Sequence, residues 1–300
     1  MTVHAVAAAT PPASPVRRLA AALYRRPRIQ LLALLAAPIG WLVIAYLGSL
    51  ALFLLTSFWQ VDSLTGNVVP NLTTGNYQEI LGEGIYQTIT IRTVVMALAV
   101  TATTIVVGFP IAFYMARVAS ARVRGLLVVS ILLPLWSGYL VKVYAWRLIL
   151  SEHGILNWLL APFGLHGPGY SIEAVWLVES YLWLPYMIIP IFAGLERIPG
   201  SLLEASADLG GRAGITFRRV ILPLALPAVV AGAIFTFSLT LGDYITPTLV
   251  SNTKFIGNAI YDLVGLAGNQ PLAAAFAMVP VTIMLVFLLV ARRLGAFEAI

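Results

Sequence analysis

Six long apolar runs set the limits on what this chain can fold into. They cover about residues 30–57, 89–116, 126–150, 172–195, 220–241 and 273–290. Each run is long enough to cross a bilayer as a helix, and none alternates polar and apolar residues as an outer-membrane strand does. Only 10% of the residues are charged, whereas about a quarter are charged in an ordinary soluble domain. We therefore predict an all-α integral membrane protein with six transmembrane helices.

The N-terminal residues 1–29 differ from the rest of the chain because they are rich in alanine, proline and arginine. They show no sustained period, so we expect a loosely ordered basic cytoplasmic tail that lies on anionic lipid. The apolar run after them is longer than the roughly 7 to 15 apolar residues of a signal peptide. We expect it to stay in the membrane as the first span of a transmembrane domain, residues 30–300.

The distribution of basic residues orients the predicted spans. One set lies in the tail, after the second and fourth runs, and at the end of the chain: Arg17, Arg18, Arg25, Arg26, Arg28, Arg117, Arg122, Arg124, Arg197, Arg212, Arg218, Arg219, Arg292 and Arg293. The loops on the other side hold Lys254, while Arg92, Lys142 and Arg147 lie within runs. Cytoplasmic loops carry the excess of lysine and arginine. Both termini and the loop 196–219 are therefore predicted to lie in the cytoplasm.

Loop 196–219 is a polar segment with the pattern of a short amphipathic helix. A Pro-Gly pair interrupts the preceding run, and Ser201, followed three residues later by Glu204, has the spacing of a capping box. The pair Gly210–Gly211 can end the helix and turn the chain. The apolar face recurs at helical spacing and consists of Leu202, Leu203, Ser206 and Leu209. We predict that this helix docks on a partner protein.

The same loop resembles the EAA loop of ABC-importer permeases, the inner-membrane permeases of binding-protein-dependent transport systems. The family pattern is Glu-Ala-Ala, three residues, Gly, nine residues, Ile, one residue and Leu-Pro. This sequence has Glu204-Ala205-Ser206, then Gly210, then Val220-Ile221-Leu222-Pro223, so the spacing matches throughout. Ser206 and Val220 stand where the pattern has Ala and Ile. The motif also lies between the fourth and fifth of six runs, as it does in the family.

The resemblance implies a permease of the bacterial cytoplasmic (inner) membrane with the type I ABC importer fold. In that family the loop forms coupling helices that sit in a groove of a separate ATPase. This assigns Glu204, Ala205, Gly210, Leu202 and Leu209 to the ATPase contact. The alternatives that Glu204 only caps its helix and that Gly210 only ends it stay open. The implied partners are an ATPase dimer, a second related permease paired as a heterodimer, and an extracytoplasmic substrate-binding protein. The resemblance places ATP and Mg²⁺ on the ATPase and no cofactor on this chain.

A second resemblance concerns the transported solute. Over most of the chain after residue 30, and especially at residues 242–247, the sequence is similar to spermidine/putrescine-type permeases. This implies transport of a polyamine, which is a small flexible polycation. Relatives for other solutes share the EAA loop, so an amino-acid derivative, iron or another ion stays open as cargo. An ATP-independent secondary carrier is a further alternative, which leaves the EAA segment unexplained.

The candidates for the substrate path are acidic and aromatic side chains in or near the spans. A charged side chain within a span is costly and is therefore a functional candidate, and aromatic faces attract cations. The set is Asp243, Tyr244, Glu179, Trp136, Tyr139 and Trp183, with Tyr181 as a further aromatic candidate. Two alternatives stay open. Each aromatic side chain can instead be an interfacial anchor, and Asp243 can be structural and neutralised by Lys254 or Lys142.

The residue inventory excludes common classes of membrane enzyme. His4, His153 and His166 lie outside the runs, so no Ser/His dyad forms within the membrane, and no cluster has metal-ligand spacing. The chain has no cysteine and no phosphate-binding loop of the Gly-x-x-x-x-Gly-Lys-Ser/Thr type. We therefore predict a transport subunit that is not itself an enzyme, with ATP hydrolysed by a partner.

Overall fold

The N-terminal part of the chain forms one helical segment. A computed structural model describes residues 27–62 and 64–293, so most of the predicted tail 1–29 lies outside the described residues. The chain divides into two compact units, Met1–Leu55 and Thr56–Ile300. In the first, helices α2 (Pro27–Trp41) and α3 (Gly48–Thr56) join through a π-helical segment, η1 (Leu42–Leu47). Its residues Leu34–Thr56 are long and apolar enough to cross a membrane.

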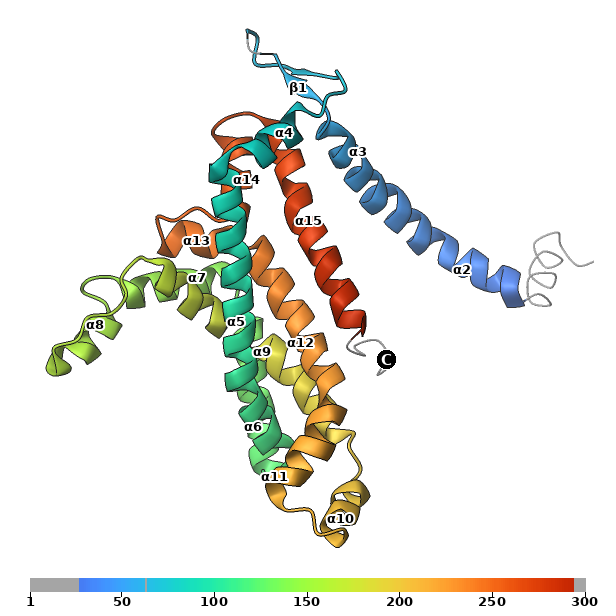
Figure 1. Cartoon of the computed structure of the whole chain (residues 1–300), viewed down its shortest axis with the longest axis vertical. Helices are drawn as coiled ribbons and strands as arrows, with labels where there is room; N and C mark the ends of the chain where they lie inside the picture. The colour runs from blue at the N-terminus through green and yellow to red at the C-terminus, as the bar shows by residue number, and fades with distance from the viewer. Residues whose placement is uncertain (1–26, 63, 294–300) are drawn as a thin grey trace, which may run out of the picture. The chain divides into compact units, whose positions relative to one another are not determined.

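The second unit starts with a small hairpin and continues as helices. Strand β1 (Gln60–Val61) pairs antiparallel with β2 (Val68–Val69). The remaining elements are α4 (Gly75–Gly82), α5 (Gly84–Arg117), α6 (Ala121–Trp136), α7 (Tyr139–Leu150), α8 (Ile155–Leu160), η2 (Ala161–Phe163), α9 (Ile172–Glu196), α10 (Gly200–Asp208), α11 (Ala213–Thr216), η3 (Phe217–Ile221), α12 (Leu222–Gly242), α13 (Ile245–Val250), α14 (Ile256–Gly265) and α15 (Gln270–Arg293). Helices α5, α9 and α12 pack together along this unit, with α4 and α14 at one end and α10 at the other (Figure 1).

Five of the predicted spans are helices long and apolar enough to cross a membrane. The third predicted span, 126–150, is not a single helix, because α6 and α7 meet at an angle of 94°. Ser137 and Gly138, between them, have extended backbone with ψ of 141° and 139°. The expectation of one helix here was wrong. An apolar composition indicates that a segment lies in the membrane, but it does not indicate whether the helix axis stays straight. Helix α7 takes its direction from packing on α13.

Small residues let the three central helices approach each other closely. A Cβ atom added at Gly194 in α9 would lie 2.4 Å from the Cβ of Ala228 in α12. A Cβ at Gly232 in α12 would lie 2.8 Å from the sulfur of Met187. Close approach of this kind is a common basis of helix association in membranes. The buried cluster around it contains Ala112, Met115, Met187, Ile188, Ile191, Leu195, Ile221, Ala225 and Val229. This tight core holds the loops at its two ends in place.

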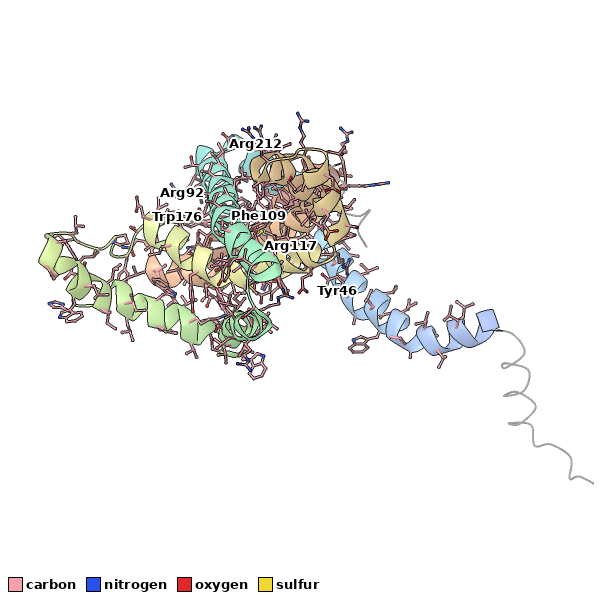
Figure 2. The ribbon with its side chains drawn as sticks, turned by 90° about the horizontal axis from the view of Figure 1, so that it is seen from below. Tyr46, Arg92, Phe109, Arg117, Trp176 and Arg212 are labelled. Carbon is pink, nitrogen blue, oxygen red and sulfur yellow. The ribbon has the colours of Figure 1, made fainter. Side chains whose placement is uncertain are left out.

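At the end of the unit that holds α14, polar side chains join neighbouring elements. Arg92 lies near the start of α5, and its Nη1 donates a hydrogen bond of 2.9 Å to the carbonyl oxygen of Lys254. Trp176 Nε1 donates to Thr103 Oγ1 over 3.0 Å, which ties α9 to α5. Arg92 and Trp176, both labelled in Figure 2, line a cavity of about 550 Å³ between these helices.

Candidate functional site

The predicted docking helix is α10, but it begins differently from the prediction. The residue before its first turn is Pro199, with no side-chain capping bond, and the helix starts at Gly200. Ser201 is therefore already inside the helix, where its backbone is helical and cannot place the hydroxyl on the free N–H groups of the first turn. The predicted capping box of Ser201 and Glu204 is wrong. Glu204 is exposed, so its carboxylate faces the surroundings of the protein.

The end of α10 confirms the predicted stop at the glycine pair. Gly210 has a φ of +79°, and its N–H donates to Ala207 O over 2.8 Å. Gly211 N–H donates to Ser206 O over 2.8 Å, and a Cβ on Gly211 would lie only 2.5 Å from that oxygen. Gly210 is thus needed for its left-handed backbone and Gly211 for a close approach. The Ser206 hydroxyl also lies 2.8 Å from that of Thr216, which ties α10 to α11.

The residues assigned to the ATPase contact all lie on the surface of this loop. Leu209 is 89% exposed and Leu202 is 43% exposed. The others, Glu204, Ala205 and Gly210, are exposed as well. Leu203, in contrast, is partly buried against the cluster around Met115 and Leu195. One side of α10 therefore anchors the helix to the core, and the other leaves apolar and acidic groups exposed.

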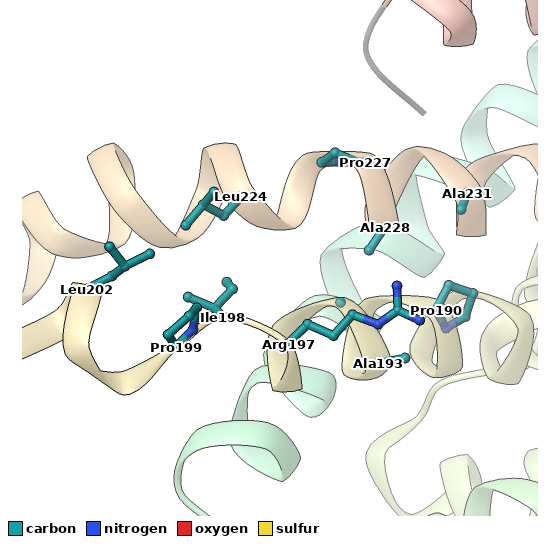
Figure 3. Close-up of a pocket in the computed structure, with 11 residues that line it drawn as sticks. Pro190, Ala193, Arg197, Ile198, Pro199, Leu202, Leu224, Pro227, Ala228 and Ala231 are labelled. Carbon is teal, nitrogen blue, oxygen red and sulfur yellow. The ribbon is translucent and has the colours of Figure 1, made fainter. Parts of the chain in front are cut away.

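A groove that the sequence did not indicate lies beside α10. It has a volume of about 460 Å³ and is bounded by α9, α12 and the first turn of α10. Its lining consists of Pro190, Ala193, Gly194, Arg197, Ile198, Pro199, Leu202, Leu224, Pro227, Ala228 and Ala231. Figure 3 shows the side chain of Arg197 lying along α9, with Leu224, Pro227 and Ala228 on α12 opposite. Sequence analysis could not find this groove, because its two walls come from separate spans.

The second candidate region is centred on Asp243, which follows the end of α12. Its Oδ1 accepts hydrogen bonds from the N–H groups of Ile245 (2.9 Å) and Thr246 (3.3 Å). Its Oδ2 accepts one of 2.5 Å from the hydroxyl of Tyr139 at the start of α7. The Tyr139 hydroxyl also lies 2.7 Å from that of Thr246. Asp243 is only 9% exposed, so its carboxylate caps α13 and fastens α7 to that helix.

Glu179 on α9 is a second buried carboxyl close to the first. It is 1% exposed, and its Oε2 has no hydrogen-bond partner within the described part of the chain. Glu179 and Asp243 lie close enough to interact electrostatically. One turn later, Trp183 stacks on Tyr139 with ring centroids 5.8 Å apart and planes 8° apart. We call Glu179, Asp243, Tyr139 and Trp183 the carboxyl–aromatic cluster.

The other candidates for the substrate path lie elsewhere. Trp136, at the end of α6, is 87% exposed. Tyr244 stacks on Tyr261 at 5.2 Å and lines a cavity of about 420 Å³ between α12, α14 and α15. Tyr181 is exposed and packs edge-on against Trp146. The structure therefore joins four of the six residues of the predicted set into one cluster.

Lys254 and Lys142 do not neutralise Asp243 in the described part of the chain. Lys254 forms its ion pair with Asp262. Lys142 lines a small cavity of about 160 Å³ with Pro134 and Tyr181. The hydrogen-bond partners that sequence analysis missed are the backbone of Ile245 and Thr246. An Asp two residues before a short helix is the signal that indicates such a cap.

No metal site was found among residues 27–62 and 64–293, because no three His, Cys, Asp or Glu side chains come together there. In the carboxyl–aromatic cluster Asp243 accepts a hydrogen bond from the Tyr139 hydroxyl, and the ring of Tyr139 stacks on that of Trp183. Carboxylates and aromatic faces are groups that attract cations.

Comparisons with known proteins agree with this geometry. Residues 105–297 match the family described as "Binding-protein-dependent transport system inner membrane component". The inner membrane ABC transporter permease protein YdcU of Escherichia coli (strain K12) is 43% identical over 293 residues, which is 92% of this chain and 93% of that protein. The spermidine/putrescine transport system permease protein PotB of Salmonella typhimurium (strain SL1344) is 30% identical over 261 residues, 85% and 90% of the two chains.

The fold matches that of solved importers. The chain superimposes with a TM-score of 0.70 on a chain of a bacterial ABC transporter involved in import of the acidic polysaccharide alginate. The two are 19% identical, and the match covers 92% of this chain and 97% of the other. At this level of identity the likeness concerns the fold alone.

Proposed function

This chain belongs to the family of inner membrane components of binding-protein-dependent transport systems, and we propose that its cargo is a polyamine. As a member it is the permease subunit of an ABC importer, a membrane component rather than an ATPase. The proposed cargo is a spermidine- or putrescine-like polycation. Similarity to permeases named for spermidine and putrescine supports this cargo.

The observation that carries the proposal is the pair of buried carboxyl groups in the carboxyl–aromatic cluster. A carboxylate and an ammonium group 4 Å apart attract each other by about 4 kcal/mol at an effective dielectric constant of 20. Each aromatic face adds roughly 0.5 to 2 kcal/mol of cation–π attraction. A flexible chain with several ammonium groups matches such a site, whereas a neutral or anionic solute gains nothing from it.

Within this cluster the two carboxyls have different roles. Asp243 already accepts three hydrogen bonds, so it holds the architecture and supplies negative potential. Glu179 Oε2 is buried without a partner in the described residues, so it is the group left to accept a hydrogen bond from an amine. Trp183 and Tyr139 form the stacked aromatic wall beside it. We assign Glu179 to direct contact with the cargo.

The proposed assembly follows from the exposed face of α10. Leu202, Leu209 and Glu204 present a surface that fits a groove of a separate ATPase. The complete importer would contain an ATPase dimer that binds ATP and Mg²⁺, a second related permease, and an extracytoplasmic binding protein. The termini and α10 then lie in the cytoplasm. Closure of the ATPase pulls the α10 helices together and switches the cavity between two rigid arrangements.

Transport assays with the reconstituted importer test the proposal. The chain, its companion permease, the ATPase and the binding protein are placed in proteoliposomes, and ATP-dependent uptake of radiolabelled putrescine, spermidine, an amino acid and ferric ion is compared. Uptake of putrescine and of spermidine, with each of them inhibiting uptake of the other, supports the proposal. Uptake of the amino acid or ferric ion in their place overturns the cargo, and uptake without ATP indicates a secondary carrier.

A further inference from the structure

Arg117, considered above only as a topology signal, makes a specific contact where α5 ends. Its Nη2 donates hydrogen bonds to the carbonyl oxygens of Leu195 and Ile198, the second at 2.8 Å. These carbonyls lie at the C-terminal end of α9. The last carbonyls of a helix have no partner within it, and the last turn of α9 contains no basic residue of its own. Arg117, labelled in Figure 2, thus caps α9 from another helix.

A second arginine strengthens the same corner. Arg124, in the first turns of α6, donates from Nε to Met115 O over 3.0 Å. Its Nη1 lies 3.0 Å from Oε1 of Glu196, the last residue of α9. A cation near the start of a helix and an anion at the end of a helix are each unfavourable with the helix dipole. In this ion pair each charge neutralises the other. Both side chains are partly exposed, and this pair is the weaker contact.

The contact reaches α10 through a very short connection. Only Pro199 separates Ile198, whose carbonyl Arg117 holds, from Gly200, the first residue of α10. The ring of Pro199 restricts its φ, here −63°. Leu195 and Ile198 are also buried in the cluster that contains Met115. Because this connection is short and restrained, a displacement of α10 should move the corner between α5 and α6 as well.

We propose that Arg117, assisted by the Arg124–Glu196 pair, is a positioning residue that makes α10 move as one body with α5 and α9. This rests on the proposed role of α10 as the contact with the ATPase. Helix α5 runs from this corner along α9 and α12 to the opposite end of the unit, so it carries the displacement across the membrane. Without the contact, α10 still binds the ATPase but moves independently of the bundle.

The test combines a functional and a structural measurement. Arg117→Met keeps an unbranched side chain and removes the donors, while Arg117→Lys keeps the charge but not the paired geometry of the guanidinium. Arg122→Met, an exposed arginine on the same corner, is the matched control. In the reconstituted importer we expect Arg117→Met to keep ATPase binding and basal hydrolysis but to lower solute uptake per ATP by about tenfold, as loss of a charged hydrogen bond implies. Arg117→Lys should lose less, and Arg122→Met should match the wild type.

The structural measurement is independent of the cargo and of the ATPase. Because the chain has no cysteine, spin labels can be placed at Ala207→Cys in α10 and Leu126→Cys in α6 of the full chain in nanodiscs. We expect a narrow distance distribution in the wild type and in Arg122→Met, and a broad one in Arg117→Met. A distribution that stays narrow in Arg117→Met overturns the inference. A broad one supports it even if reconstitution shows that α10 does not couple to an ATPase, which would overturn only the proposed function.

Discussion

The hydroxyl of Tyr139 donates a hydrogen bond of 2.5 Å to Oδ2 of Asp243, 104 residues away along the chain. This bond lies next to the 94° break between α6 and α7. It fastens the first residue of α7 to the corner between α12 and α13. The direction of α7 and the position of the carboxyl–aromatic cluster therefore depend on the same contact.

Tyr139→Phe should destabilise the protein without disturbing the stacking on Trp183. The substitution leaves the buried Oδ2 of Asp243 without its donor, which costs about 1–3 kcal/mol. We expect a lower midpoint of thermal unfolding in nanodiscs. Tyr181→Phe is the control, because Tyr181 is exposed and packs on Trp146 by its ring. Equal midpoints for the two variants would argue that the Tyr139–Asp243 bond contributes little.

Asp243→Asn should weaken uptake of a polyamine while the variant still assembles with the ATPase. The amide removes the negative charge and replaces one acceptor oxygen by a donor group. Uptake of radiolabelled spermidine and copurification of the ATPase measure the two effects separately. Uptake at the wild-type level would remove Asp243 from the substrate path and leave it as a helix cap.

Glu179→Gln keeps the shape of the side chain and removes its charge. We expect spermidine uptake to fall by about tenfold or more, because a carboxylate near an amine contributes several kcal/mol at low effective dielectric. Glu173→Gln, on the same helix but exposed, provides the matched control. If both variants transport spermidine equally well, Glu179 is not a contact for the cargo.

Gly210→Pro should abolish transport-coupled stimulation of the ATPase while membrane insertion stays intact. Proline has a φ near −65° and cannot adopt the +79° found here, so the chain after α10 must change direction. Gly214→Ala is the control, since an added Cβ there meets nothing within 4 Å. Stimulation of hydrolysis by the loaded binding protein is the measurement. Normal stimulation in the Gly210→Pro variant would contradict the coupling role.

Gly194→Ala should destabilise the contact between α9 and α12, although alanine is the better helix former. The new Cβ would lie 2.4 Å from that of Ala228, and overpacking of this kind costs typically about 1–3 kcal/mol. The double variant Gly194→Ala/Ala228→Gly removes the opposing Cβ and should recover most of the lost stability. Thermal unfolding of the wild type, both single variants and the double variant measures the recovery. No recovery would mean that the loss has another origin.

Several features could be read from local sequence because they depend on neighbouring residues alone. Five of the six apolar runs of span length form helices long enough to cross a membrane, as predicted. The glycine pair ends α10 where predicted. The predicted capping box was wrong. It requires Ser201 to be the residue before the first turn, but the helix already starts at Gly200. Spacing alone does not decide which residue begins a helix.

By itself the sequence determined that the chain is a helical membrane protein, that its basic residues gather in alternate loops, and that the loop around Glu204 and Gly210 has the family's spacing. These properties follow from hydropathy, charge and short-range backbone preference. The tertiary structure alone decided that one span bends, that Glu179 and Asp243 lie together, and that Arg117 caps a helix ending 79 residues later, at Glu196. Such contacts depend on which helices pack together, and that packing is set by close approach at positions such as Gly194 and Gly232, which no local pattern reveals.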